Sequence, residues 1–510
     1  MNTKTWQKYL FTLITGLSLL YTNSVQSQII PDNTLGNENS KFTPSQIKDL
    51  IEGGAIRGNN LFHSFSEFNV NNNQQVYFTN PLGINNILTR VTGNNISNIF
   101  GTLGVNGNAN LFLINPNGII FGPNARLDVQ GSFLASTAPS IKFADGNVFS
   151  AKDTSTTPLL TMSVPVGIQW GNNQSGDITN NGNLTVGNGQ NLTLLGDNVT
   201  NTGNLTASGG KIQVLGNNIN ILNPSKIDVS APNQGGVILI GGDYQGKGEI
   251  NAQNTNIENG VNINADGLIN GDGGKVIVWA DKTTKFEGNI TANGGEISGN
   301  GGFVEVSGKE NLIFRGDVKT TALNGLSGTL LIDPTNIIIA SGSGGNITDS
   351  NDNTTIYQST LEGMSGNTNI ALQANNNITI NPLTNGILNL ANGNGTITFT
   401  ADADSNGVGN FQMETANTIK TNGRDISISG ASLILGNIDT SFVKGGDIIA
   451  VVDVDAGGAI PDSGDATFTF TVSDKKSVEN LDVQFSAAHT WDRDLTVNLT
   501  SPSGTTLKLF

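Results

Sequence analysis

The sequence predicts an all-β protein: a right-handed parallel β-helix (a solenoid) with an N-terminal cap, followed by a partial β-sandwich of the jelly-roll type. Three observations support this fold class. The 510 residues include 65 glycines, and about one residue in seven is asparagine, well above ordinary usage. Both residue types favour turns over helix interiors. From about residue 60 onward, short apolar or β-branched runs alternate with Gly, Asn and Asp, which is typical of strands joined by tight turns.

Residues 1–27 are expected to be a signal peptide. Lys4 and Lys8 precede an apolar run at 10–20, and residues 25–27 offer small side chains for cleavage. The run of about eleven residues is too short to span the ~30 Å of a bilayer core. Cleavage is therefore expected rather than a membrane anchor, and the mature chain is expected outside the inner membrane.

Residues 28–170 are expected to form a first β-helical domain and residues 171–457 a β-helical stalk. The irregular stretch 32–68 is expected to cap the N-terminal end, since open strand edges pair with other chains. At ~20 residues per coil and ~4.8 Å per rung, residues 50–450 would form about twenty coils over a length on the order of 100 Å. Asn side chains at the corners can stack into ladders along the axis.

A glycine pair leading into alternating apolar residues recurs along the chain. The pairs begin at Gly209, Gly235, Gly273, Gly301 and Gly445. The uneven spacing indicates corner loops of variable length rather than a strict tandem repeat. A string of β-sandwiches or a propeller remains an alternative, but Asn-rich turns without regular hairpin dipeptides favour the solenoid.

Residues 458–510 differ from the preceding residues in their sequence pattern. The strands lengthen, as at 466–472 and 495–499, and strictly alternate apolar and polar residues. Such alternation indicates one buried and one solvated face, and hence an antiparallel sandwich.

Charge and cysteine content exclude several functions. A net charge of −16 disfavours binding to nucleic acid or to an anionic membrane, both of which need clustered Lys and Arg. The absence of cysteine excludes disulfides, Cys-ligated zinc, iron–sulfur clusters and a thiol nucleophile.

Two stretches carry a family resemblance: 78–93, with Asn80-Pro81-Leu82-Gly83, and 111–122, with Asn115-Pro116-Asn117-Gly118-Ile119. Together they resemble the filamentous haemagglutinin N-terminal secretion domain of two-partner secretion systems, in the form typical of cyanobacterial surface proteins, over residues 30–170. The resemblance implies a capped right-handed β-helix that a dedicated outer-membrane β-barrel transporter recognises through its periplasmic domains.

By the same resemblance, recognition of the partner transporter is assigned to two turns. The residues concerned are Asn115, Pro116, Asn117, Gly118, Ile119, Asn80 and Pro81. Each turn also has a purely structural interpretation, because Pro fixes φ and Asn-Gly supplies positive φ. A rigid turn can serve both roles.

The C-terminal residues resemble the P domain of proprotein convertases. The matching residues are Ile460-Pro461-Asp462, Val483, His489 to Leu495 and Leu499 to Thr505. The family's last strands are missing, so the domain is expected to be partial.

An enzyme is not expected. A Ser-His-Asp triad needs a histidine base, and the only histidines are His63 and His489, neither in a subtilisin-type motif. Two alternatives stay open. One is a carbohydrate-active β-helix with paired carboxylates, and the other is an accessory or remnant of a subtilisin-like protease through the P domain.

No cofactor is expected apart from a weak calcium candidate. Asp402, Asp404 and Asn406 resemble the first half of an EF-hand loop, but Met413 stands where a bidentate Glu is needed. An Asx-rich turn is the default interpretation.

The sequence therefore predicts a non-enzymatic, adhesin-like protein, secreted or displayed on the cell surface by way of the periplasm and the outer membrane. Its expected partners are the outer-membrane transporter and glycans of cell surfaces or matrix. It is not expected to bind nucleic acid, and it would contact a membrane only during export.

Overall fold

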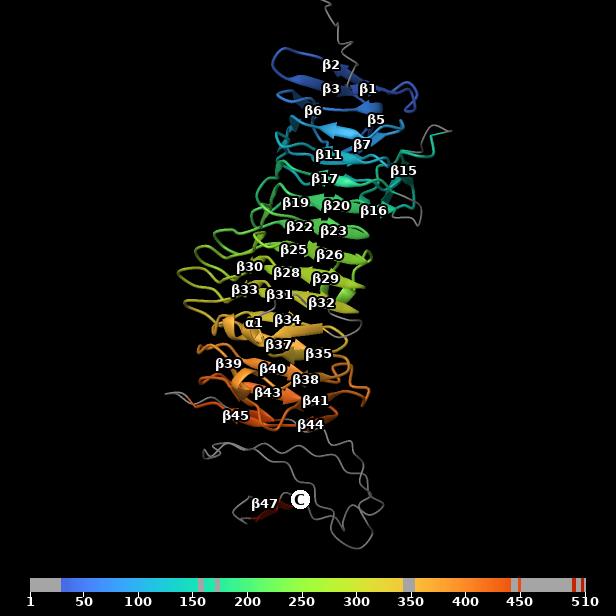
Figure 1. The fold of residues 1–510 in the computed structure, drawn as a ribbon. Coiled ribbons are helices and arrows are strands. Elements are labelled where there is room, and N and C mark those ends of the chain that lie inside the picture. The colour runs from blue at the N-terminus through green and yellow to red at the C-terminus, as the bar shows by residue number, and fades with distance from the viewer. Residues whose placement is uncertain are drawn as a thin grey trace, which may run out of the picture.

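The computed structural model describes residues 29–154, 160–169, 175–342, 354–441, 448–450, 498–500 and 506–508. Most of the described chain winds through three parallel sheets, here called face 1, face 2 and face 3 in the order in which each coil visits them (Figure 1). This arrangement is a parallel β-helix, so the predicted fold class is confirmed for the coil. The signal peptide prediction at 1–27 lies outside the described residues.

Face 1 runs the length of the coil. Its parallel strands are β5 (Asn60–Phe68), β7 (Asn86–Val91), β10 (Asn110–Ile114), β13 (Phe133–Ser136), β19 (Asn191–Leu195), β22 (Lys211–Leu215), β25 (Val237–Ile240), β28 (Lys275–Ala280), β31 (Phe303–Gly308), β34 (Thr329–Ile332), β37 (Asn369–Gln373), β40 (Ile397–Thr400), β43 (Ile426–Ser429) and β46 (Ile448–Ala450).

Face 2 follows face 1 in each coil. Its strands, in spatial order, are β8 (Ser97–Ile99), β11 (Ile119–Phe121), β17 (Ile178–Asn180), β20 (Asn198–Asn201), β23 (Asn218–Ile221), β26 (Asn254–Ile257), β29 (Thr283–Phe286) and β32 (Asn311–Phe314), and then β36 (Thr354–Tyr357), β35 (Ile337–Ala340), β38 (Ile378–Ile380), β41 (Asn410–Met413) and β44 (Ser432–Ile434).

Face 3 completes the coil. Its strands are β3 (Asp49–Gly53), β6 (Gln75–Thr79), β9 (Thr102–Asn106), β12 (Arg126–Asp128), β18 (Asn183–Thr185), β21 (Asn204–Thr206), β24 (Lys226–Asp228), β27 (Asn262–Asn264), β30 (Asn289–Thr291) and β33 (Asp317–Lys319), and then β39 (Ile387–Asn389), β42 (Thr418–Lys420) and β45 (Asn437–Asp439).

The core is a set of apolar columns along the axis. The strand register places one buried apolar residue from each coil directly above the next. One column on face 1 contains Leu61, Ile87, Leu111, Phe133, Leu192, Ile212, Ile238, Val276, Val304, Leu330, Ile370, Ile397 and Ile426. The apolar alternation in the sequence is therefore the inward face of each strand.

The expectation of about twenty coils is wrong. Face 1 has fourteen parallel strands from β5 to β46 among the described residues. At ~4.8 Å per rung they span about 60 Å. The reason is the length of the corner loops: Leu192 pairs with Ile212, twenty residues on, whereas Ile238 pairs with Val276, thirty-eight residues on.

The N-terminal end is capped, as expected for the stretch 32–68. Strands β1 (Ile29–Pro31) and β4 (Ala55–Arg57) pair antiparallel with β5, and β2 (Ser40–Thr43) pairs antiparallel with β3. These pairs cover strand edges that the coil would otherwise leave open.

A small antiparallel sheet lies beside the first coils, formed by β14 (Ser140–Phe143), β15 (Val148–Ser150) and β16 (Pro165–Gln169) (Figure 1). Ile141 and Phe149 of this sheet belong to a buried cluster with Phe62 and Leu88 from face 1. The ladder of face 1 continues past this insertion, because β13 pairs with β19.

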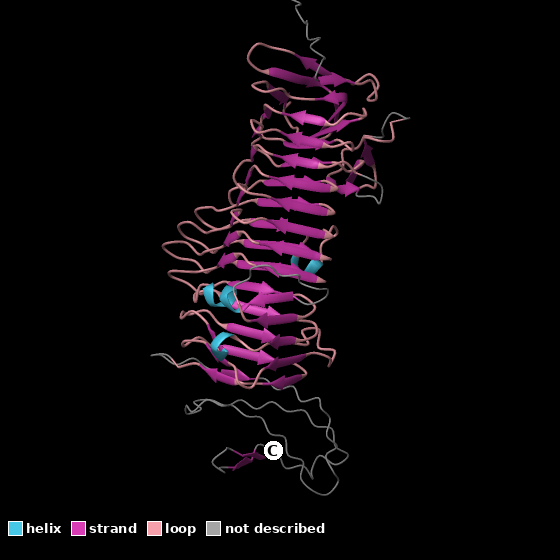
Figure 2. Cartoon of the chain, in the orientation of Figure 1, coloured by secondary structure: helices cyan, strands magenta, loops and turns pink. Residues whose placement is uncertain are grey.

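The coil changes after residue 320. The first sheets of faces 2 and 3 end at β32 and β33, and strand β36 pairs with β35 on face 2. The helix α1 (Gln358–Gly363) follows β36, with Leu361 buried, and the 3-10 turns are η1 (Tyr244–Gly246) and η2 (Thr384–Gly386). Figure 2 shows how little helix accompanies the strands. Within the described residues, no helix has both the length and the hydropathy that a membrane span requires.

Only one hairpin is described at the C-terminus, formed by β47 (Asn498–Thr500) and β48 (Thr506–Lys508). The rest of the predicted sandwich at 458–510, including the strand at 466–472 and His489, lies outside the described residues.

Candidate functional site

The turn at 115–119 joins β10 to β11 at the corner between face 1 and face 2. The Asn115 side chain accepts hydrogen bonds from the backbone N–H of Asn117 at 3.0 Å and from its side-chain amide at 3.1 Å. Asn115 in turn donates to the carbonyl of Asn95 at 3.0 Å and to Ser97 Oγ at 2.9 Å. Gly118 has φ of 131°, a region that favours glycine.

Most of this turn is buried. Asn115, Pro116, Gly118 and Ile119 are all buried, and only Asn117 is partly exposed. Asn117 donates to the carbonyl of Gly93 at 2.7 Å and lies 3.5 Å from Lys152 Nζ through its side-chain oxygen. Asn117 and Lys152 are therefore among the side chains that this corner offers to another protein, together with the exposed Ile96, which lies against Gly118. Sequence reasoning missed Lys152, which lies 35 residues away.

The turn at 80–83 lies at a different corner, between face 3 and face 1. Asn80 accepts a hydrogen bond from the backbone N–H of Ala109 in the next coil at 3.1 Å and donates to the carbonyl of Ile84 at 3.0 Å. Pro81, Leu82 and Gly83 are exposed, and Leu82 is fully so. The structure thus does not bring the two turns into one site, although it presents the second one openly.

The calcium candidate lies in the loop between β40 and β41. Asp402 has φ of 54°, and its carboxylate accepts the backbone N–H groups of Asn406 at 2.9 Å and Gly407 at 3.1 Å. Asn406 donates to Asp404 at 2.8 Å. These contacts are those of an Asx-rich turn. The described residues contain no group of three or more His, Cys, Asp or Glu arranged to hold a metal ion, and calcium binding stays a prediction.

A carboxylate pair that sequence reasoning missed lies on the outer side of face 1. Glu305 of β31 is fully buried beneath the loop that contains η1, and its two oxygens accept the backbone N–H of Gln245 at 3.2 and 3.1 Å. The Gln245 side chain donates to Asp333 at 3.2 Å. The one available sequence signal was an acidic residue inside the apolar alternation after Gly301-Gly302.

The electrostatics of this pair follow from burial. Burial, together with the smaller effect of the nearby charge of Asp333, raises the pKa of Glu305 to about 7. Burial likewise raises the pKa of Asp333. Because Glu305 has no exposed surface, the pair does not meet a substrate in this conformation.

His63 is also buried and cannot act as an accessible base. It lies within the first coil strand, 3.1 Å from Ser40 Oγ through Nδ1. Burial lowers its pKa to about 3, so the ring is neutral at physiological pH.

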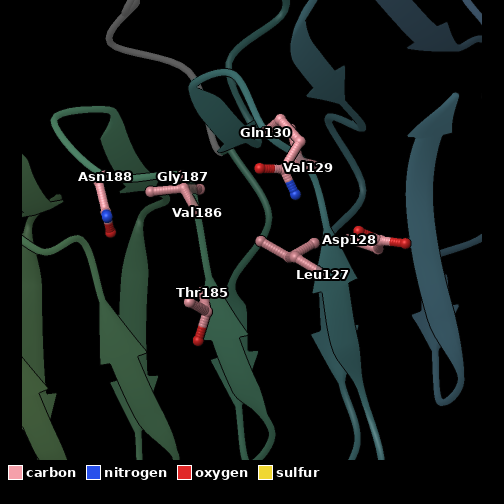
Figure 3. Close-up of a pocket in the computed structure, with 8 residues that line it drawn as sticks. All are labelled: Leu127, Asp128, Val129, Gln130, Thr185, Val186, Gly187 and Asn188. Carbon is pink, nitrogen blue, oxygen red and sulfur yellow. The ribbon is translucent and has the colours of Figure 1, made fainter. Parts of the chain in front are cut away.

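A shallow recess of about 290 Å³ lies between the ends of β12 and β18 (Figure 3). It is lined by residues 127–130 and 185–188. The side chains of Leu127 and Thr185 approach each other, while Asp128 and Asn188 lie apart from them on either side. Asp128 accepts a hydrogen bond from the Tyr77 hydroxyl at 2.7 Å. The recess brings together no set of groups suited to catalysis or to a cofactor.

Comparison with known proteins gives one family. The model of the TPS (two-partner secretion) secretion domain matches residues 27–320. The comparison with curated proteins found no match. Among solved structures, the HMW1 secretion domain from Haemophilus influenzae matches at 18% identity and a TM-score of 0.42, over 83% of this chain and 98% of that one. The family match ends next to β33, where the first sheets of faces 2 and 3 end.

Proposed function

The chain belongs to the TPS secretion domain family and is therefore exported across an outer membrane with a partner transporter; from this premise we propose that it is an adhesin-like protein, secreted or held at the cell surface. The observation that carries the proposal is the family match over residues 27–320. The cyanobacterial type of the secretion domain and the partial P domain remain parts of the same proposal.

Export without an energy source at the outer membrane suits this architecture. A chain that crosses unfolded and folds outside gains buried apolar area with each coil, because each coil stacks only on its neighbours. The columns of the core form one coil at a time, so folding can follow the emerging chain. We expect this stepwise folding outside the cell to bias translocation outward.

The proposed recognition element for the transporter is the pair of turns at Asn115–Ile119 and Asn80–Gly83. In the folded chain, the parts available for contact include Asn117 with Lys152 at one corner and Pro81 with Leu82 at the other. The two corners are separate, so the proposal requires a transporter surface that contacts both or a contact at one of them alone.

Adhesion to neutral glycans is proposed for the outer side of face 2. Half-exposed amide and hydroxyl side chains lie in register there, at Thr179, Thr200, Asn220 and Asn256. Such groups donate and accept hydrogen bonds and match sugar hydroxyls.

The enzyme alternatives are weaker. A carbohydrate-active site would use Glu305 with Asp333, but Glu305 is covered by the η1 loop. A protease-associated role would depend on the P domain, most of which lies outside the described residues.

The proposal is tested by comparing single variants in a strain that carries the partner transporter. Asn117→Ala and Leu82→Ser alter a partly exposed and a fully exposed side chain of the turns, and we expect each to lower the amount in the medium several-fold. Leu82→Ser should leave the thermal unfolding midpoint unchanged, whereas Asn117→Ala should lower it slightly because it loses the hydrogen bonds to Gly93 and Asn115. Asn115→Ala should lower both the amount in the medium and the thermal unfolding midpoint, because it removes buried hydrogen bonds. Val408→Ser, at an exposed position outside residues 27–320, is the matched control.

Normal export of Asn117→Ala and Leu82→Ser would contradict recognition through the turns. In that outcome, a lower unfolding midpoint for Asn115→Ala would leave the turn with a structural role. Export in the absence of any partner transporter would contradict the secretion mechanism itself.

A further inference from the structure

The corner between face 3 and face 1 carries three long loops, 265–274, 292–302 and 320–328, here called the fin. They project from the middle of the coil beside β30 and β33 (Figure 1). Consecutive loops are joined by backbone hydrogen bonds, such as Gly271 N–H to Ser298 O at 2.8 Å and Gly301 N–H to Leu326 O at 2.9 Å. The fin is therefore a stack of paired loops rather than a set of independent ones.

Glycine residues allow the loops of this stack to pack closely. A Cβ on Gly271 would lie 1.4 Å from the carbonyl oxygen of Asn233, and one on Gly299 would lie 2.0 Å from that of Gly271. No side chain fits between loops at such distances. The loops of the fin are thus closely packed on one another and on Asn233 of the preceding corner loop.

The rim of the fin carries five exposed aliphatic side chains among exposed polar ones such as Asn270, Ser298 and Asn324. Leu268, Ile269, Ile297, Leu323 and Leu326 are between 45% and 80% exposed. Ile297 N–H donates to Ile269 O at 2.9 Å, and Asn324 donates through its side chain to Glu296 O at 3.0 Å. Ile269, Ile297 and Leu323 therefore lie on successive rungs, and these three residues are here called the stripe. Exposed aliphatic side chains gathered on neighbouring rungs mark interaction surfaces.

The charge of the fin has one sign. Its loops contain Asp266, Asp272 and Glu296 and no Lys or Arg. Asp266 and Asp272 accept hydrogen bonds from Asn293 and Asn300, whereas Glu296 is exposed. A second copy of this chain would bring carboxylates against carboxylates, on a molecule that already carries a net charge of −16. An anionic lipid surface is disfavoured for the same reason.

We propose that the fin is a docking surface for a basic amphipathic helix of another polypeptide, with aliphatic side chains against the stripe and Lys or Arg beside Glu296. The spacing supports a helix as the occupant. Rungs rise by ~4.8 Å and a helix by ~5.4 Å per turn, so residues at i, i+4 and i+7 can each meet one rung of the stripe. This partner is separate from the transporter, and the test does not depend on export.

The test measures binding of the purified full chain to a labelled 18-residue helical peptide of Leu and Lys, by fluorescence anisotropy. The fin variant is Ile269→Ser, Ile297→Ser and Leu323→Ser together. The control variant is Ile47→Ser, Val408→Ser and Ile434→Ser, which removes exposed aliphatic side chains elsewhere. Both variants keep the charge of the parent, and circular dichroism checks that both are folded.

We expect the parent and the control variant to bind with the same Kd and the fin variant at least tenfold more weakly. Glu296→Lys should also weaken binding, and a peptide with Glu in place of Lys should not bind. Equal binding by the fin variant, equal binding of the Glu peptide, or no binding by the parent would each overturn the proposal. So would fin-dependent dimerisation in sedimentation, which would assign the surface to a second copy, or fin-dependent flotation with phosphatidylcholine vesicles, which would assign it to a membrane.

Discussion

Single buried polar side chains decide how this coil responds to its surroundings, and Glu305 is the clearest case. Its carboxylate faces the backbone N–H of Gln245, with Asp333 and Lys275 as the charged groups nearby. Burial raises its pKa to about 7, from an ordinary value near 4.5. Because the folded state holds the proton more tightly than the unfolded state does, this group stabilises the fold at low pH. That contribution is complete below the unfolded pKa and is lost as the pH rises through 7.

We predict that Glu305 by itself makes the fold more stable at pH 5 than at pH 8, by up to about 3 kcal/mol. The buried His63, whose pKa is lowered to about 3, acts in the opposite direction over this range. Glu305→Gln keeps the shape without the charge and retains His63, so its thermal unfolding midpoint at pH 5, relative to that at pH 8, should be lower than in the parent. Between pH 5 and pH 8, hydrogen exchange at the Gln245 amide should accelerate by more than the intrinsic pH dependence of amide exchange predicts. An unchanged pH dependence in Glu305→Gln would show that Glu305 does not titrate in this range.

At the scale of the element, the corners and not the strands distinguish one coil from the next. The buried Asn180 side chain donates to Asn201 at 2.7 Å, and Asn201 donates to the carbonyl of Gly203 at 2.9 Å and also to Ser225. An exposed ladder runs beside it, where Asn204 donates to Asn183 at 2.7 Å. The many asparagines of the sequence thus form two kinds of side-chain ladder, one buried and one exposed.

Asn201→Ala should cost about 1–3 kcal/mol of unfolding free energy, because it leaves buried polar groups without partners. Asn204→Ala is the matched control, and it should cost less than about 1 kcal/mol since water replaces the lost contact. Denaturant unfolding followed by circular dichroism measures both. Equal losses of unfolding free energy in the two variants would mean that burying the ladder does not add to its contribution to stability.

The glycine pairs act at the same scale. A Cβ on Gly235 would lie 2.0 Å from the carbonyl oxygen of Ala265, whereas a Cβ on Gly363 would have nothing within 4 Å. We therefore expect Gly235→Ala to destabilise the chain by more than about 2 kcal/mol and Gly363→Ala to change stability by less than about 1 kcal/mol. Thermal unfolding of the two variants compares them directly. A neutral Gly235→Ala would show that the backbones can separate at little cost.

For the whole molecule, the coil behaves as a one-dimensional stack in which each rung contacts its neighbours. Among the described residues, the first sheets of faces 2 and 3 end at β32 and β33, whereas face 1 continues from β31 to β34. The family match ends at the same place, at residue 320. Two independent observations therefore indicate a natural boundary there.

We predict that a chain shortened to residues 1–320 folds and is exported with the partner transporter, because it ends on a complete coil. A chain shortened to 1–286 ends inside a coil, and it should unfold at a lower temperature and reach the medium in smaller amounts. Thermal unfolding and the amount in the medium measure both. An unfolded 1–320 chain would show that the coils beyond β33 are needed for the earlier ones.

The sequence by itself determined the fold class and the positions of many strands, because alternation and Gly or Asn punctuation act over a few residues. It also located the corners: the pairs at Gly209, Gly235, Gly273 and Gly301 each lead into a face 1 strand. Only the tertiary structure decided the number of coils, the burial of Asn115, the pairing of Glu305 with Asp333 and the stacking of the fin. Each of these depends on residues far apart in the sequence, such as Asn115 and Asn95 or Glu305 and Gln245, which meet only when one coil stacks on another. The lengths of the corner loops and the strand register together set which residues meet.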